Sequence, residues 1–411
     1  MNDPINLLCT VPPKEVKDDF LIPFRLSNEE IILLSEQLPK LSFELTTLEI
    51  EGERNNLETE YCDIDRYNLL QQLKQVHSDK RARKYLNQVY PYEVANKSIF
   101  VNRAALKLAN LDKIFQLTAH LTGAVNKEVP GKFMFCDLAG GPGGFTQYLQ
   151  YRWPEATGFG ITYKKVIDWD INKIDTTRFV PIYGDKGDGN LYYEWNFFAR
   201  TVKDQSPQGV DLVVADGGFD ITEGDDFERQ EFLSTRLILI EILLGIMLTK
   251  EKSLTKDAGS KLENNPVEFQ TPSFVFKVFD TVTQPSAFLL LICSLAFEEI
   301  YIWKPVMSRW TNSERYVVCR NKRRNLDQLI DLLIKAIEVQ TDQERMALVK
   351  GITLPDSFIK WLTDRNNESI DLQTKTASQM IKLIRGDTLT DLPKVNLHQL
   401  LIVLDLPGER Y

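Results

Sequence analysis

Residues 135–145 read FCDLAGGPGGF and carry the strongest local signal in the chain. An apolar run leads into four glycines and a proline, and a helical pattern follows. Open α/β sheets bind ligands at such junctions, outside the carboxyl ends of their strands, where glycines let the backbone approach a ligand closely. The dinucleotide fingerprint requires a glycine where this chain has Thr146, and no P-loop Gly-Lys-Ser/Thr follows. We therefore expect a ligand loop that takes neither NAD nor ATP, with a tight structural turn as the alternative.

Short β-rich runs lie on both sides of this loop and alternate with helical patterns. Helices are expected at 144–152, at roughly 227–249 and at roughly 285–297. Most of the predicted strands are apolar throughout, which is typical of strands covered on both faces. This alternation predicts an α/β fold with a mainly parallel sheet and helices on both sides. The predicted strands are 133–138, 157–162, 179–183, 210–215, 273–279, 299–303 and 315–319.

The two ends of the chain and one internal stretch have other patterns. Residues 1–64 are expected to form an N-terminal accessory region, in which Ser27 and Glu30 make the capping box of a short helix. Residues 250–272 are polar and indicate a surface insertion. Residues 326–411 begin with apolar side chains at helical spacing, which predicts a small C-terminal helical region for docking or packing.

Length and composition exclude a disordered chain, a collagen and a small disulfide-stabilised protein. The chain has 411 residues, of which 43% are hydrophobic, and a net charge of −9, all ordinary for a globular protein. Its apolar runs are shorter than the roughly 20 residues of a membrane-spanning helix, and its start lacks the features of a signal peptide. The five scattered cysteines form no C-x-x-C pair, which favours reduced thiols in the nucleus or cytoplasm. The three histidines lie far apart in the sequence, so no metal site is expected.

Positive charge is concentrated in one stretch of this acidic chain. Residues 74–107 hold eight lysines and arginines against two acidic residues. Tyr85, Tyr90 and Tyr92 are interleaved with them, a mixture that suits phosphate contacts and base stacking. A solvated helix face is the alternative interpretation. An RNA-binding site at this stretch is compatible with the net negative charge if the protein grips only the end of an RNA.

Six blocks of sequence, in the same order, resemble the FtsJ-like ribose 2'-O-methyltransferases, and the eukaryotic and viral mRNA cap-1 members in particular. They include FVNRAALK at 100–107, VADGGF at 214–219, FVFKVFD at 274–280 and NSERY at 312–316. The glycine loop DLAGGPGGF at 137–145 in addition resembles the family's donor loop. The resemblance implies a Rossmann-like methyltransferase domain at 65–325, with a seven-stranded, mostly parallel sheet whose last strand is antiparallel. It also implies S-adenosyl-L-methionine as the methyl donor. The implied acceptor is the ribose 2'-hydroxyl of the first transcribed nucleotide of 5'-capped RNA.

The resemblance places the family's four catalytic groups on Lys107, Asp216, Lys277 and Glu314. Lys277 lies within an apolar run, where an unpaired lysine is costly, so it needs a carboxylate partner or a function. We expect Lys277 to steer and deprotonate the hydroxyl, Asp216 to orient Lys277, and Lys107 with Glu314 to complete the charge network. Burial and Lys107 would lower the pKa of Lys277, whereas Asp216 and Glu314 would raise it.

The resemblance also implies contacts to the donor and to RNA. Arg83, Arg309 and Asn312 are expected to contact RNA, and an aromatic side chain of the basic stretch is a candidate to hold the cap's methylguanine. The second predicted strand ends in residues 162–164 without an acidic residue, so the group that holds the donor ribose is not identified. The expected donor contacts are Ala139, Gly140, Gly141, Pro142, Gly143, Gly144, Phe145, Asp188 and Asn190.

Two other functions stay open at this point. One is methylation of the second nucleotide or of structural RNA. The other is an inactive RNA-binding or scaffold subunit, although such a role gives no reason to retain all four catalytic groups. Expected partners are 5'-capped RNA and a capping enzyme or RNA polymerase, with no membrane. The expected location is the nucleus or the cytoplasm, including a viral factory or virion, and not outside the cell.

Overall fold

The computed structural model describes residues 21–47, 59–74, 99–118, 133–218, 230–251 and 271–386, with residues 401, 402, 404 and 406. Several predictions lie outside these ranges. They are the RNA contact Arg83, the tyrosines at 85, 90 and 92, and most of the predicted insertion at 250–272.

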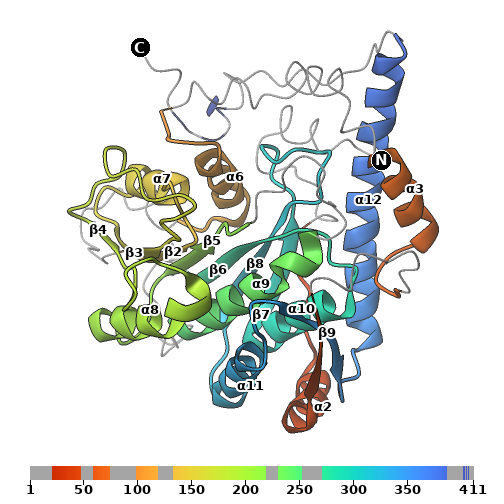
Figure 1. The fold of residues 1–411 in the computed structure, drawn as a ribbon, viewed down its shortest axis with the longest axis horizontal. Coiled ribbons are helices and arrows are strands. Elements are labelled where there is room, and N and C mark those ends of the chain that lie inside the picture. The colour runs from red at the N-terminus through yellow and green to blue at the C-terminus, as the bar shows by residue number, and fades with distance from the viewer. Residues whose placement is uncertain are drawn as a thin grey trace, which may run out of the picture.

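A seven-stranded sheet with the order β4-β3-β2-β5-β6-β8-β7 forms the centre of the molecule (Figure 1). Strands β2 to β6 are parallel, and β8 runs antiparallel to both of its neighbours, β6 and β7. The predicted sheet and its antiparallel last strand are thereby confirmed. The strands are β2 (Met134–Leu138), β3 (Thr157–Ile161), β4 (Phe179–Pro181), β5 (Leu212–Ala215), β6 (Ser273–Val278), β7 (Phe297–Trp303) and β8 (Arg315–Lys322).

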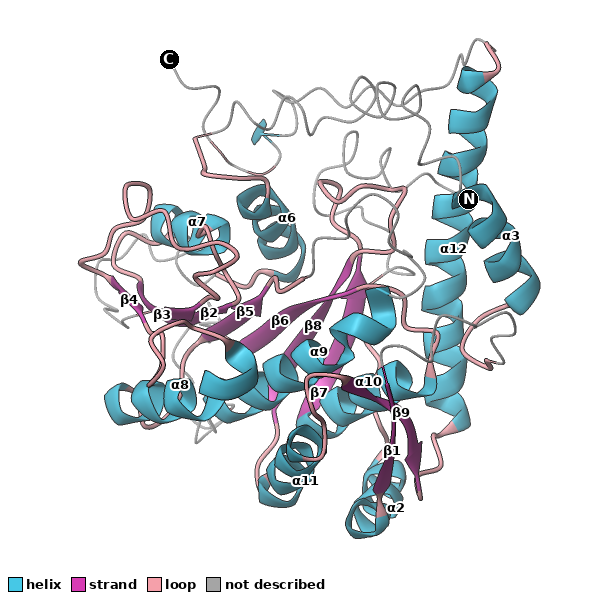
Figure 2. Cartoon of the chain, in the orientation of Figure 1, coloured by secondary structure: helices cyan, strands magenta, loops and turns pink. Residues whose placement is uncertain are grey.

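Helices cover both faces of this sheet, as predicted (Figure 2). Strand alternation gives each face its own apolar cluster. Val275 and Tyr316 belong to the cluster under α6 and α7, whereas Phe274, Phe276 and Val317 belong to the cluster under α8 to α11. Helix α8 was not predicted. The helices are α6 (Ala104–Phe115), α7 (Gly144–Arg152), α8 (Leu191–Gln205), α9 (Gln230–Leu248), α10 (Gln284–Ala296) and α11 (Asp327–Glu338).

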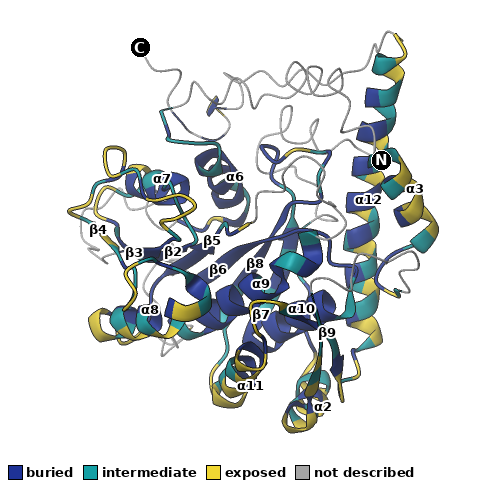
Figure 3. Cartoon of the chain, viewed as in Figure 1, coloured by how far each residue is buried: buried dark blue, intermediate teal, exposed yellow. Residues whose placement is uncertain are grey.

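Burial follows this layering (Figure 3). Helices α9 and α10 are buried along nearly their whole lengths, while α8 and α11 keep one exposed side. None of the helices in the described ranges has the length and apolar character needed to cross a membrane.

The two end regions of the chain share a small second sheet. The predicted capping box is present, because Ser27 accepts from the Glu30 amide and Glu30 accepts from the Ser27 amide, at the start of α2 (Asn28–Gln37). After α2, β1 (Ser42–Thr47) pairs antiparallel with β9 (Glu344–Lys350). The C-terminal region is therefore not helical throughout, since β9 lies between α11 and α12 (Asp356–Ile384). Helix α12 also packs against α3 (Ile64–Lys74). The boundaries at 64/65 and 325/326 stay predictions.

Candidate active site

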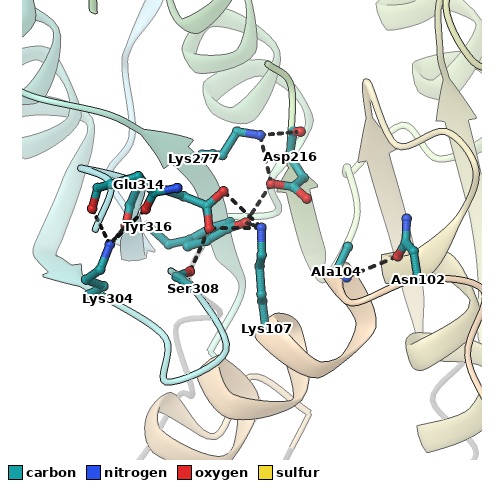
Figure 4. Close-up of polar contacts among 10 residues, drawn as sticks. Asn102, Ala104, Lys107, Asp216, Lys277, Lys304, Ser308, Glu314 and Tyr316 are labelled. Carbon is teal, nitrogen blue, oxygen red and sulfur yellow. Dashed lines mark hydrogen bonds and ion pairs between the residues drawn. The ribbon is translucent and has the colours of Figure 1, made fainter. Parts of the chain in front are cut away.

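The carboxyl end of the central strands gathers the four predicted catalytic side chains (Figure 4). Asp216 directly follows β5, and Lys277 is the fifth residue of β6. Glu314 directly precedes β8, and because β8 is antiparallel, its start lies beside the end of β6. Lys107 reaches the same place from α6, the helix that covers this face of the sheet. The structure thus brings together residues that are up to 207 positions apart.

Two ion pairs form the core of the site. The Lys277 Nζ lies 3.2 Å from the Asp216 Oδ1 and donates a 3.0 Å hydrogen bond to the backbone oxygen of Asp216. The Lys107 Nζ lies 2.9 Å from a carboxylate oxygen of Glu314. All four residues are largely buried, so each charge depends on its partner for stabilisation. The predicted carboxylate partner of Lys277 is therefore Asp216.

Tyr316 joins the two ion pairs and was not among the predicted site residues. Its hydroxyl donates a 2.5 Å hydrogen bond to the Asp216 Oδ1 and accepts a 3.4 Å bond from the Lys107 Nζ. Tyr316 pairs directly with Lys277 across the β6–β8 ladder, so both side chains project toward α6. The available signal was its position two residues after Glu314, on the same face of a strand.

Electrostatics at the site favour charged groups. Burial lowers the pKa of Lys277, but the carboxylates of Asp216 and Glu314 raise it more, so the net pKa lies above its usual value. Burial raises the pKa of Glu314, but Lys107 and Lys277 together hold it far below its usual range. Burial therefore lowers the pKa of Lys277 and the carboxylates raise it, as expected, and the effect of the carboxylates is the larger. Without a ligand, Lys277 is therefore an ammonium group at neutral pH.

Residues of the loop that leads into β8 form hydrogen bonds with Glu314. Ser308 donates a 2.6 Å hydrogen bond to the Glu314 Oε1. Lys304 donates to the backbone oxygens of Asn312, at 2.7 Å, and of Glu314, at 2.8 Å, and also to the Asn312 side-chain oxygen, at 3.2 Å. Two RNA contacts were predicted in this loop. The Asn312 side chain accepts from Lys304, and Arg309 is exposed.

The glycine loop follows β2 and opens α7. Gly143 caps α7 with a φ of 109°, a left-handed conformation that favours glycine. A Cβ on Gly140 would lie 2.2 Å from the Asp137 Oδ1, so only glycine fits above that buried carboxyl group. The other oxygen of Asp137 accepts from Thr146 Oγ1 at 2.7 Å. The loop's backbone therefore packs closely against the carboxyl group of Asp137 at the end of β2.

Two further loops lie against the glycine loop. The Gly141 amide donates to the Thr162 Oγ1 at 3.1 Å, which ties the loop to the end of β3. The Lys164 amide donates to the Asp188 backbone oxygen at 3.0 Å, which ties β3 to the loop after β4. Asn190 caps α8 through its side-chain oxygen. The two loops that carry the predicted donor contacts are thus connected through the residues that follow β3.

The side chain of Phe145, one of the predicted donor contacts, is buried in an apolar cluster. Phe145 is 1% exposed and packs in the apolar cluster under α6 and α7, with its ring centroid 6.2 Å from that of Tyr316. Its backbone alone remains for a ligand. The side chain instead packs beside the ring of Tyr316.

Comparison with known proteins gives consistent matches. Residues 100–322 match the family model described as FtsJ-like methyltransferase. The chain is 32% identical to the Drosophila melanogaster cap-specific mRNA (nucleoside-2'-O-)-methyltransferase 1, over 75% of this chain and 40% of that protein. The Homo sapiens protein of the same name is 29% identical, over 81% of this chain and 41% of that protein. The Xenopus laevis protein is 29% identical, over 85% and 42%. The chain spans about two fifths of the length of these relatives.

Proposed function

Because this chain belongs to the FtsJ-like methyltransferase family, we propose that it methylates the ribose 2'-hydroxyl of the first transcribed nucleotide of 5'-capped RNA, with S-adenosyl-L-methionine as donor. The observation that carries this proposal is the buried network of Lys107, Asp216, Lys277 and Glu314 at the carboxyl end of the sheet. The relatives are named for 2'-O methylation of capped mRNA, which supports the choice of acceptor.

The glycine loop and its two neighbours fit the donor. A Cβ on Gly141 would lie 2.6 Å from the backbone oxygen of Ile167, so this backbone is closely packed on the protein side and presents its other side to a ligand. We assign the donor to residues 139–145, with Asp188 and Asn190 beside them. When bound, S-adenosyl-L-methionine supplies a methyl group that a positive sulfonium makes electrophilic.

Lys277 is the residue that acts on the acceptor. As an ammonium, it donates a hydrogen bond that orients the ribose hydroxyl, while Asp216 fixes the position of its Nζ. A second positive charge close to Lys277, such as the donor's sulfonium, would lower the pKa of Lys277 and so favour its neutral amine. The amine can then accept the hydroxyl proton as the new bond forms. Lys107 and Glu314 keep the remaining charges balanced.

Methyl transfer to defined transcripts tests this proposal. Cap-0, cap-1 and uncapped RNAs of one sequence are incubated with the protein and labelled donor, and the modified nucleotide is mapped. Label on the first nucleotide of cap-0 RNA alone is the expected result. Label on cap-1 RNA at the second nucleotide would indicate methylation of the second nucleotide, and equal label on uncapped RNA would indicate methylation of structural RNA. RNA binding without any label would indicate a scaffold subunit.

Replacement of Lys277 in the same assay tests the assigned chemistry. Lys277→Ala is expected to reduce kcat by roughly 10³-fold or more, because it removes the group proposed to orient and deprotonate the acceptor hydroxyl. Donor binding, measured by calorimetry, should change little. Transfer at the wild-type rate by Lys277→Ala would sink the assignment.

Partners and location form the last part of the proposal. We assign 5'-capped RNA as the substrate, and a capping enzyme or RNA polymerase as the further partner. We place the protein in the nucleus or cytoplasm, where capped transcripts occur.

A further inference from the structure

Helix α9 carries a carboxyl group where none is expected. Residues 237–246 of this buried helix are apolar except for Glu241, which is 0% exposed. Neither of its oxygens has a hydrogen bond of ordinary geometry among the described residues, and its one polar backbone contact there is with Gly217, which lowers its pKa. A carboxyl group buried in this way is costly, so a structural position alone gives no reason for it.

Glu241 lies directly beneath the turn that carries Asp216. A Cβ on Gly217 would lie 2.2 Å from the Glu241 Oε1, so the carboxyl group occupies the space that a side chain at 217 would fill. On the other side of the same turn, a Cβ on Gly218 would lie 2.8 Å from the Lys277 Nζ. Residues 216–218 are therefore held between Glu241 and the proposed catalytic lysine.

The charged surroundings of Glu241 come from four elements. Lys277 on β6 and Asp216 after β5 are nearest, and Tyr316 on β8 and Tyr192 on α8 also face it. Burial raises the pKa of Glu241 to about 8, Lys277 lowers it, and Asp216 raises it again. At neutral pH the group is therefore mainly a carboxylic acid, and the ion-pair partners of Lys107 and Lys277 are Glu314 and Asp216.

We propose that Glu241 is a positioning residue that supports the turn at 216–218 as a neutral acid, and that its ionisation sets an upper pH limit for methyl transfer. An ionised Glu241 adds a third negative charge beside Asp216 and Lys277. That charge repels Asp216 and holds the proton on Lys277 more tightly, which opposes proton acceptance. This inference rests on the proposed function.

The test compares the pH profile of kcat for the wild type and Glu241→Gln between about pH 6 and pH 9.5. Glutamine keeps the shape and remains neutral, so the variant should stay within about threefold of the wild type at pH 7 and lose the decline above pH 8. Glu241→Leu, which removes the polar support, should lose about tenfold or more at every pH. An alkaline decline that persists in Glu241→Gln would overturn the proposal.

Glu231→Gln is the matched control on the same helix. Glu231 is also buried, but it accepts from the amide and hydroxyl of Thr283, away from the turn at 216–218. This variant should keep the wild-type alkaline decline. If the decline disappears here too, it reflects general loss of stability and the proposal is wrong.

Thermal unfolding, which requires no enzymatic activity, tests the ionisation of Glu241 separately from the proposed function. The thermal midpoint of Glu241→Gln, relative to the wild type, should rise as the pH increases from 7 to 9, because only the wild type must bury a new charge. Parallel midpoints across that range would refute ionisation of Glu241. If no transcript is methylated but the midpoints diverge, the proposed function is wrong and the ionisation of Glu241 is still supported. In that case the proposed effect of Glu241 on methyl transfer is also wrong.

Discussion

At the scale of single residues, the hydroxyl of Tyr316 hydrogen-bonds to one member of each of the two ion pairs, Asp216 and Lys107. Tyr316→Phe keeps the buried ring and removes only this connection. We expect kcat to fall by about tenfold, because Asp216 loses one of the bonds that fix it, and unfolding free energy to fall by about 1 kcal/mol. Steady-state kinetics and denaturant unfolding measure the two effects.

Tyr301→Phe is the matched control for that prediction. The Tyr301 hydroxyl donates to the Glu299 Oε2 at 3.0 Å within β7, the edge strand of the sheet. Its loss should leave kcat unchanged. Equal kcat values for the Tyr316→Phe variant and the wild type would show that the ion pairs need no connection.

The sequence predicted the charged residues of the site but not the uncharged ones. Lys107, Asp216, Lys277 and Glu314 stand in recognisable blocks, and a lysine within an apolar strand demands a partner wherever it occurs. Tyr316 and Glu241 are different, because a tyrosine in a strand and a single acid in a helix have ordinary structural uses. Their roles depend on the β6–β8 register and on which turn lies above α9, and neither can be read locally.

At the scale of elements, helix α12 holds the ends of the two catalytic strands. Arg315, the residue after Glu314, donates to the backbone oxygen of Phe279 at 3.2 Å and to the side-chain oxygen of Asn366, on α12, at 2.9 Å. The Asn366 side chain in turn donates to the backbone oxygens of Tyr61 and Thr281. One asparagine therefore fixes β6, β8 and the N-terminal segment together.

Asn366→Ala is expected to destabilise the protein by about 1–3 kcal/mol, because it leaves Arg315 and two buried carbonyl groups short of a partner. It should also lower kcat, since Arg315 sets the position of Glu314. Asn367→Ala is the control, because Asn367 bonds only the amide of Asp63 among the contacts described and is partly exposed. Equal losses of kcat in both variants would show that α12 acts only through overall stability.

The elements differed in how far the sequence predicted them. Both ends of each of the seven strands were predicted to within about two residues, except the end of β8, which lies further along the chain at Lys322. Apolar runs bounded by polar turns identify buried strands well. Helix α8 was missed, although Asn190 caps it, because its aromatic residues resemble a strand composition. Strands β1 and β9 were missed because each finds its partner about 300 residues away, and neither has an apolar pattern on its own.

At the scale of the whole molecule, buried acids make stability depend on pH. Burial raises the pKa of Asp137 and Glu231 to about 7, and that of Glu241 to about 8. Between about pH 4.5 and 7 the folded state therefore binds more protons than the unfolded state. Stability is highest near the lower limit and falls as the pH rises, by at most about 1.4 kcal/mol per unit for each acid.

Denaturant unfolding at pH 5.5 and pH 7 measures this fall, and the double variant with Glu231→Gln and Glu241→Gln should show a smaller one. Above pH 7 the trend weakens, because burial lowers the pKa of Lys304 to about 7 and of Lys322 to about 8. Lysines with a lowered pKa add stability as the pH rises. A wild-type stability that increases between pH 5.5 and pH 7 would contradict the assignment of neutral acids.

The pairing of β1 with β9 has a consequence for how the protein is made. A ribosome releases β1 about 300 residues before β9, so the small sheet cannot close until the main sheet has been synthesised. Asn366 follows β9 in the chain, so its hydrogen bond with Arg315 can form only after α12 has been synthesised. A nascent chain that has completed β8 therefore holds every catalytic side chain but not yet the contacts that fix them. The methyl transfer proposed above therefore requires synthesis to proceed past β9 and through α12.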